Sequence, residues 1–144
     1  MDKKKILITG VSGLVGTLLA ESLKHKYEIM GVDLEESNQV QTVKANCSIL
    51  QDILPAFHGV DTVIDLASNP SQYSAWDVIH GVNLKCTSNA LEASKISGVK
   101  RVIFASSNHA TGMYEFDSPY SEIVKGDYSG LESDSIPLIT TDMP

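Results

Sequence analysis

A glycine-rich turn, TGVSGLVG at residues 9–16, is the feature that most limits how this chain can fold. The apolar run at residues 4–9 predicts a buried strand before the turn, and apolar residues at helical spacing after it predict a helix. Gly10 admits unusual backbone dihedrals, Gly13 admits close approach of a pyrophosphate, and Gly16 admits tight packing of helix on strand. Because the helix then offers free N–H groups and the positive end of its dipole, we interpret the turn as a phosphate-binding loop.

Asp33 closes a second apolar run, at residues 27–32, and stands 20 residues after Gly13. In a dinucleotide-binding βαβ unit, a carboxylate at this place accepts hydrogen bonds from the adenosine ribose. Glu35 and Glu36 follow closely, and the single arginine of the chain is far away in sequence. Since a 2′-phosphate would be repelled here, the sequence predicts a site for NAD rather than NADP.

Apolar runs and helical patterns alternate along the chain as far as residue 105. Further strands are expected at residues 40–45, 61–66 and 99–105, and further helices at 49–57 and 75–97, with Pro55 and Gly81 weakening them locally. Right-handed crossovers then give an α/β fold, a Rossmann-type doubly wound parallel sheet of strand order 3-2-1-4-5. The runs ILI, VIDL and VIFA predict strands that are buried on both faces.

The character of the chain changes after Met113. Residues 114–144 hold seven acidic side chains, one lysine and three prolines, and they show no sustained period. We therefore interpret residues 1–112 as a dinucleotide-binding domain and residues 113–144 as an acidic, loop-like tail.

Composition excludes several functions. A formal charge of -7 argues against nucleic acid as a partner, and no apolar run approaches the roughly 18 to 20 residues of a membrane span. Cys47 and Cys86 have no metal-ligand spacing, so we interpret them as ordinary reduced thiols of a cytoplasmic protein and expect no metal.

Four motifs together resemble the extended short-chain dehydrogenase/reductase family, also called NAD-dependent epimerase/dehydratase. They are the glycine turn with Asp33, DLAS at residues 65–68, Asn83, and VIFASSNH at residues 102–109. Within the family, FASSNHATGMYE is similar to the uronate dehydrogenases and to the short-chain NAD-dependent glucose-6-phosphate dehydrogenases. The resemblance covers residues 4–116 and implies oxidation of a sugar at its anomeric carbon with NAD.

The resemblance also implies roles for individual residues. Ser107 matches the catalytic serine that polarises the reacting oxygen, although Ser106 and Ser107 could instead cap the strand end, and His109 could be a structural histidine. Substrate-binding positions are Ser68, Ser107, Asn108 and His109. Cofactor-binding positions are Gly10, Ser12, Gly13, Leu14, Val15, Gly16, Asp33, Asn46, Leu66, Ala67, Ser68 and Asn83, of which Asn46 would approach the adenine and Asn83 would act through structural hydrogen bonds.

The general base of this family is missing from the sequence. The family uses Tyr-x-x-x-Lys, in which the lysine lowers the pKa of the tyrosine, and none of the five tyrosines has a lysine four positions later. The catalytic helix and a sixth strand would follow the tail, after Pro144.

We therefore expect the NAD-binding part of a sugar oxidoreductase, inactive by itself. The alternatives are a nucleotide-sugar epimerase/dehydratase with an unrecognised base and a non-catalytic NAD-binding module. The family is usually homodimeric, and the sequence leaves the oligomeric state open.

Overall fold

The computed structural model describes residues 3–71, 73–107 and 115–129. The chain forms two compact units, Met1–Ala105 and Ser106–Pro144. The functional division expected from the sequence, with residues 1–112 as the dinucleotide-binding domain and 113–144 as a tail, stays a prediction.

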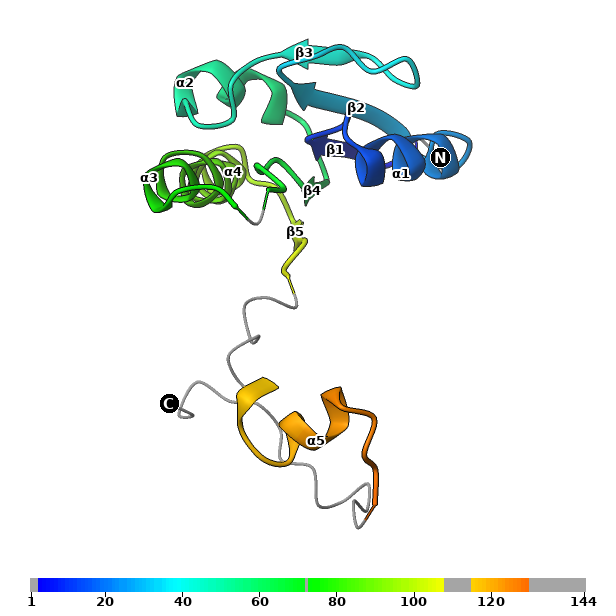
Figure 1. Cartoon of the computed structure of the whole chain (residues 1–144). Coiled ribbons are helices and arrows are strands. Elements are labelled where there is room, and N and C mark those ends of the chain that lie inside the picture. Colours follow the sequence, from blue (N-terminus) through cyan, green and yellow to red (C-terminus); the bar gives the residue numbers. More distant parts are fainter. Residues whose placement is uncertain (1–2, 72, 108–114, 130–144) are drawn as a thin grey trace. The chain divides into compact units, whose positions relative to one another are not determined.

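The first unit contains a parallel sheet in the order β3-β2-β1-β4-β5 (Figure 1). Each neighbouring pair of strands is parallel. The sheet confirms the predicted Rossmann-type topology, because the chain moves outward from β1 to β3 and then returns to the other side of β1. The strands are β1 (Lys5–Thr9), β2 (Glu28–Asp33), β3 (Thr42–Lys44), β4 (Thr62–Asp65) and β5 (Arg101–Phe104).

Helices connect these strands at the places that the apolar periodicity predicts. Pro55 lies where an α-helix tightens into a 3-10 turn, since proline cannot donate the next helical hydrogen bond. Gly81 lies within a π-helical segment that interrupts the long helical run before β5. The helical elements are α1 (Leu14–Leu23), α2 (Leu50–Ile53), the 3-10 turn η1 (Leu54–Phe57), α3 (Trp76–Ile79), the π segment η2 (His80–Leu84) and α4 (Lys85–Ile96).

The sheet has a separate apolar core on each face. Alternation along β1 sends Ile6 and Ile8 to one face, where they pack with Ala20 of α1. Leu7 points to the other face, into the larger core that also includes Phe57 of η1. Helices therefore cover both faces, as expected of a doubly wound sheet.

The prediction that β5 is buried on both faces is wrong. Ile103 is 47% exposed and Phe104 is 55% exposed. The physical reason is that β5 is the edge strand of the described sheet. Val102 packs against the larger core, whereas Ile103 lies on the opposite face beside Ile64.

The second unit contains a short helix, α5 (Tyr120–Val124), within the segment that we expected to be loop-like. Glu122 lies in its first turn, where a negative charge favours the helix dipole. A helix of five residues is too short to produce an apolar period, so the sequence pattern did not reveal it.

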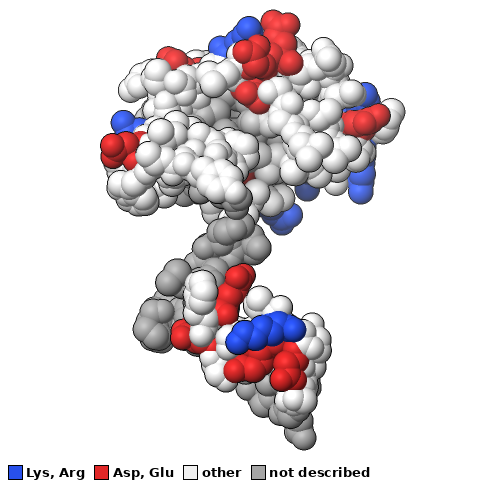
Figure 2. Space-filling model, in the orientation of Figure 1, with Lys and Arg blue, Asp and Glu red and all other residues white. Residues whose placement is uncertain are grey.

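The surface carries charges of both signs. On the face shown in Figure 2, acidic and basic side chains of the first unit lie in small separate groups with uncharged surface between them. Among the helices of the described residues, none combines the length and apolar character that a membrane crossing requires.

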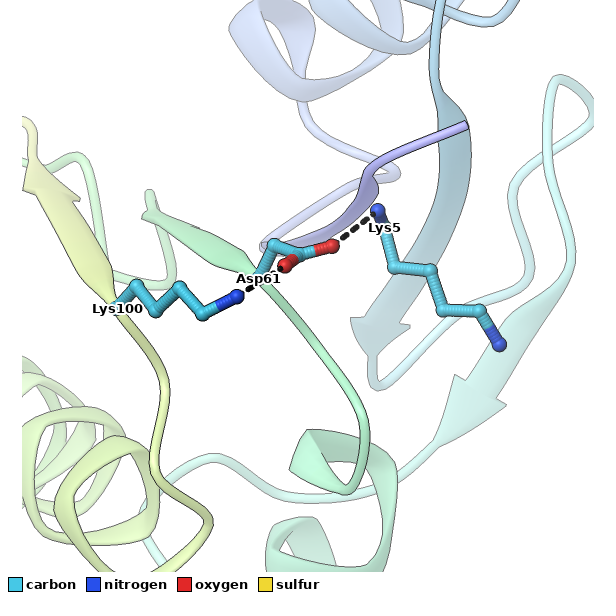
Figure 3. Close-up of polar contacts among 3 residues, drawn as sticks. All are labelled: Lys5, Asp61 and Lys100. Carbon is cyan, nitrogen blue, oxygen red and sulfur yellow. Dashed lines mark hydrogen bonds and ion pairs between the residues drawn. The ribbon is translucent and has the colours of Figure 1, made fainter. Parts of the chain in front are cut away.

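Asp61 joins β1 to the residues that enter β5, at the amino ends of the strands (Figure 3). Its carboxylate accepts a hydrogen bond from the backbone N–H of Lys5 at 3.0 Å. The same carboxylate forms an ion pair with the Lys100 ammonium at 3.2 Å. The Lys5 hydrogen bond, and then the Lys100 contact, lower the pKa of Asp61 below its ordinary value of 3.8.

We expect Asp61→Asn to destabilise the protein at neutral pH but not in acid. A carboxyl group with a lowered folded pKa stabilises the fold fully above its ordinary pKa of 3.8, and this contribution is lost as the pH falls through the folded pKa. Urea unfolding at pH 7 and at a pH well below 3.8 measures the difference. Glu21→Gln, on an exposed carboxylate of α1, is the matched control. If Asp61→Asn changed the free energy of unfolding equally at both pH values, the stabilising role of the ionised Asp61 carboxylate would be contradicted.

Candidate cofactor site

A pocket of about 250 Å³ opens at the carboxyl ends of the strands in the first unit. The strand order reverses between β1 and β4, and the crevice at such a reversal is the usual ligand site of doubly wound sheets. The lining residues are Gly10, Ser12, Gly13, Asp33, Leu34, Ala45, Asn46, Cys47, Leu66, Ala67, Ser68, Pro70, Val82 and Cys86.

Gly10 gives the turn after β1 its shape. Its φ is +69°, and its N–H donates to the carbonyl of Val32 at 2.8 Å. A Cβ at Gly10 would lie 2.9 Å from backbone atoms of Leu66 and Ala67. The turn therefore lies directly against the chain that leaves β4, and both the dihedral and the lack of space require glycine.

The first turn of α1 is open to a ligand. Gly13 is the N-cap residue, and no side chain in the described part of the chain caps the helix there. The N–H groups of the first helical turn have no partner within a helix, so they are available to a phosphate. Gly16 is buried beneath them, and a Cβ there would lie 2.4 Å from the carbonyl oxygen of Gly10.

The Asp33 carboxylate is fixed at the end of β2 by the glycine turn itself. Its Oδ2 accepts from the backbone N–H of Ser12 at 2.9 Å and from the Ser12 hydroxyl at 2.6 Å. Its Oδ1 accepts from the N–H of Leu34 at 2.7 Å. A carboxylate has about four lone-pair sites, so one further donor can be bound.

Thr9 holds in place the backbone of Leu66 and Ala67, which line the opposite wall of the pocket. Its hydroxyl donates to the buried Asp65 carboxylate at 2.6 Å and accepts from the N–H groups of Leu66 and Ala67 at 3.1 and 3.2 Å. One hydroxyl thus joins the end of β1 to the first residues after β4.

Two asparagines shape the loops around the pocket. The side-chain oxygen of Asn46 accepts from the N–H of Ser48 at 3.0 Å and from its hydroxyl at 2.8 Å. Asn83, in η2, makes two hydrogen bonds to the backbone of Asn69: its oxygen accepts at 2.7 Å and its amide donates at 3.1 Å. Asn83 therefore holds the loop after β4 and lies outside the pocket lining.

Cys47 and Cys86 meet in the pocket wall, which the sequence did not reveal. Both are free thiols, buried, and in the lining. The Cys86 thiol nearby, together with burial, raises the pKa of Cys47. The Cys47 thiol in turn lowers the pKa of Cys86.

The structure groups most, but not all, of the residues that the sequence singled out. Ser107 is exposed and belongs to the second unit, and Asn108 and His109 lie outside the described residues. Eight expected cofactor residues line the pocket, namely Gly10, Ser12, Gly13, Asp33, Asn46, Leu66, Ala67 and Ser68, whereas Leu14, Val15, Gly16 and Asn83 do not. Sequence reasoning missed Leu34, Ala45, Cys47, Pro70, Val82 and Cys86.

The positions of the missed residues explain why they were missed. Ala45 and Cys47 are the first and third residues after β3, so their place at the carboxyl edge of the sheet was a usable signal. Val82 and Cys86 come from a helical run that reaches the pocket only through the tertiary fold. No group of three or more potential metal ligands occurs in the part of the chain that the structure describes.

Comparison with known proteins identifies the family. Residues 6–129 match the model of the NAD dependent epimerase/dehydratase family, so the chain belongs to this family. The family resemblance inferred from the sequence is thus confirmed.

Two curated relatives and one crystal structure illustrate the match. L-arabinose 1-dehydrogenase (NAD(P)(+)) of Haloferax volcanii is 33% identical over 76% of this chain and 43% of its own length. Uronate dehydrogenase of Pseudomonas putida is 29% identical over 78% of this chain and 44% of its own length. A mutant uronate dehydrogenase of Agrobacterium tumefaciens, complexed with NAD, is 26% identical with a TM-score of 0.67, over 74% of this chain and 42% of that one. The chain therefore spans less than half the length of each of these proteins.

Proposed function

We propose that this chain is the NAD-binding part of an NAD-dependent oxidoreductase that oxidises a sugar or uronate at its anomeric carbon. The observation that carries the proposal is the Asp33 carboxylate, which the glycine turn holds at the rim of a pocket at the strand-order reversal. The similarity to arabinose and uronate dehydrogenases supports a sugar as the substrate.

The pocket residues fit the parts of NAD. Gly10 and Gly13 leave room for a pyrophosphate against the backbone, and the first turn of α1 supplies N–H donors. Asp33 would accept a ribose hydroxyl, and residues 66–68 would line the nicotinamide side. The bound cofactor would accept a hydride from the substrate. The residues of this chain would hold and orient the cofactor.

Ser107 would polarise the reacting oxygen, with Asn108 and His109 helping to place the sugar ring. These roles come from the family motif SSNH. In the sequence, Ser107 follows the last residue of β5 by three positions.

We expect the chain to bind NAD more tightly than NADP, by roughly 10- to 100-fold. Asp33 can accept one more hydrogen bond, which a hydroxyl supplies and a phosphate does not, and a charge repulsion of about 1 to 4 kcal/mol opposes the 2′-phosphate. Glu35 and Glu36 add negative charge close by. Isothermal titration calorimetry with both cofactors measures the ratio.

Asp33→Asn provides the control for this preference. The amide is nearly the same size but uncharged, so the variant should keep some NAD affinity and lose most of its discrimination. Equal or tighter binding of NADP to the unaltered chain would overturn the proposed role of Asp33.

Two other functions have specific support. The family match favours an NAD-dependent epimerase or dehydratase acting on a nucleotide sugar. A pocket that is lined entirely by residues of the first unit would also suit a non-catalytic NAD-binding module. Incubation of the longest available protein with NAD and candidate sugars distinguishes the three functions. An oxidoreductase accumulates NADH with a free sugar, and an epimerase or dehydratase converts a nucleotide sugar without net NADH. A binding module does neither.

A further inference from the structure

Two thiols meet in the pocket although they are far apart in the sequence. Cys47 lies in the loop after β3, and Cys86 lies in the first turn of α4. Their exposed fractions are only 6% and 4%, yet both line the pocket, so the small accessible part of each faces the ligand space.

The surrounding structure holds the two thiols together. Both belong to the larger core, in which Phe57 and Ala90 are fully buried. The side-chain amide of Asn89, one turn after Cys86 on α4, donates to the backbone carbonyl of Cys47 at 3.0 Å. This bond attaches the loop after β3 to α4 beside the two thiols, which share one core and one pocket wall.

The pKa values of the two thiols shift in opposite directions. The Cys86 thiol and burial raise the pKa of Cys47, which stays protonated, whereas the Cys47 thiol lowers the pKa of Cys86. Asp65 opposes ionisation of both thiols through its negative charge. Since the thiolate is the attacking form, we expect Cys86 to react before Cys47 with a small electrophile that enters the pocket.

We propose that Cys47 and Cys86 form a redox site in the pocket wall, which small organic disulfides oxidise and which excludes NAD when oxidised. The proposal rests on the proposed binding of NAD in this pocket. The Cys86 thiolate attacks one sulfur of the small disulfide and releases one small thiolate. Cys47 then gives its proton to the released thiolate and attacks the Cys86 sulfur, which releases the second small thiolate; this thiolate takes up from solvent the proton that Cys86 lost on ionisation. In sum, two protein thiols become one disulfide and the small disulfide becomes two thiols.

Oxidation and cofactor binding oppose each other for geometric reasons. Cys47 adjoins Asn46, which would approach the adenine, and shares the pocket wall with Asp33 and Leu34. A disulfide draws the loop after β3 and α4 closer together than two thiols in contact require, and the intermediate adduct on Cys86 fills pocket space. Bound NAD, in turn, covers both thiols.

The test treats the chain with oxidised glutathione and follows the intact mass. We expect the unaltered chain to lose two hydrogen atoms per molecule with little stable adduct. Cys47→Ser should keep one glutathione on Cys86, and Cys86→Ser should react much more slowly. With NAD at about ten times its dissociation constant, oxidation of the unaltered chain should slow about tenfold.

Calorimetry on the reduced and oxidised chains completes the test. We expect the oxidised chain to bind NAD at least about tenfold more weakly, a difference of about 1.4 kcal/mol. If the reduced chain does not bind NAD, the proposed function fails and the exclusion fails with it. If both forms bind NAD equally, or if NAD does not slow oxidation, only the proposal that the disulfide excludes NAD from the pocket is wrong. Thermal unfolding of each serine variant checks that the variant is folded. In the mass experiment, a stable glutathione adduct on the unaltered, folded chain would show that no disulfide forms.

Discussion

Given NAD and a panel of aldoses, uronates and sugar phosphates, the 144-residue chain is expected to form NADH at least about 100-fold more slowly than an enzyme with the full family motif. In its proposed role, Ser107 would donate a hydrogen bond to the reacting oxygen, but a serine does not replace a tyrosinate whose pKa is lowered by lysine. Loss of a general base costs typically about 100- to 10,000-fold, and incomplete positioning of the substrate adds to that loss. NADH absorbance measures the rate.

His109 provides the decisive variant for this prediction. Histidine is the side chain that ordinarily titrates near neutral pH, so His109, two positions after Ser107 in the sequence, is the residue of this motif best suited to act as a base. Turnover at ordinary enzyme rates that disappears in His109→Ala would show that His109 is the base and that the chain is a complete catalyst. In a longer protein that carries Tyr-x-x-x-Lys, Ser107→Ala should abolish most activity and leave NAD affinity nearly unchanged.

Gly16→Ala is expected to destabilise the first unit by about 1 to 3 kcal/mol and to weaken NAD binding. The added Cβ would lie 2.4 Å from the Gly10 carbonyl oxygen and 2.7 Å from the Val11 Cα. Both are backbone atoms, so no side-chain rotation relieves the clash. Alanine favours helix over glycine by about 1 kcal/mol, but the clash exceeds this gain. Urea unfolding monitored by circular dichroism gives the change in stability.

Gly81→Ala is the matched control for Gly16→Ala. Gly81 also lies within a helical run, but a Cβ there meets no heavy atom within 4 Å apart from its chain neighbours and the backbone of its own helix. The same substitution should therefore be neutral or slightly stabilising at Gly81. Equal effects at the two positions would show that the closeness of α1 to the turn does not control stability.

The fold was predictable because local and global signals agree in this chain. The glycine turn, the apolar strand runs and the alternation of helix and strand each favour the same doubly wound sheet, and the observed order confirms it. Burial of β5 was not predictable from the run VIFA, because its composition suits a buried strand whereas its exposure depends on which elements cover the sheet edge.

The site was predictable where its residues follow strands and unpredictable where they come from helices. Gly10, Asp33 and the residues after β4 lie at strand ends, and topology alone brings such ends together. Cys86 reaches the pocket because α4 packs back on the sheet, and no sequence spacing shows that it lines the same pocket as Cys47. The donors that fix Asp33 were also invisible, since a serine in a glycine turn does not indicate its hydrogen-bond partner.

The Thr9 hydroxyl has a consequence for the order of folding. It bonds to residues 56 to 58 positions further along the chain, and those bonds exist only when β1 and β4 have paired. A newly made N-terminal βαβ segment therefore contains the glycine turn and Asp33 but has no opposite wall to its ligand site. Such distant contacts form late, because the closure entropy of a long loop opposes them. Ligand affinity thus arises together with the completed central sheet, and a ligand that binds there stabilises the sheet as a whole instead of one loop.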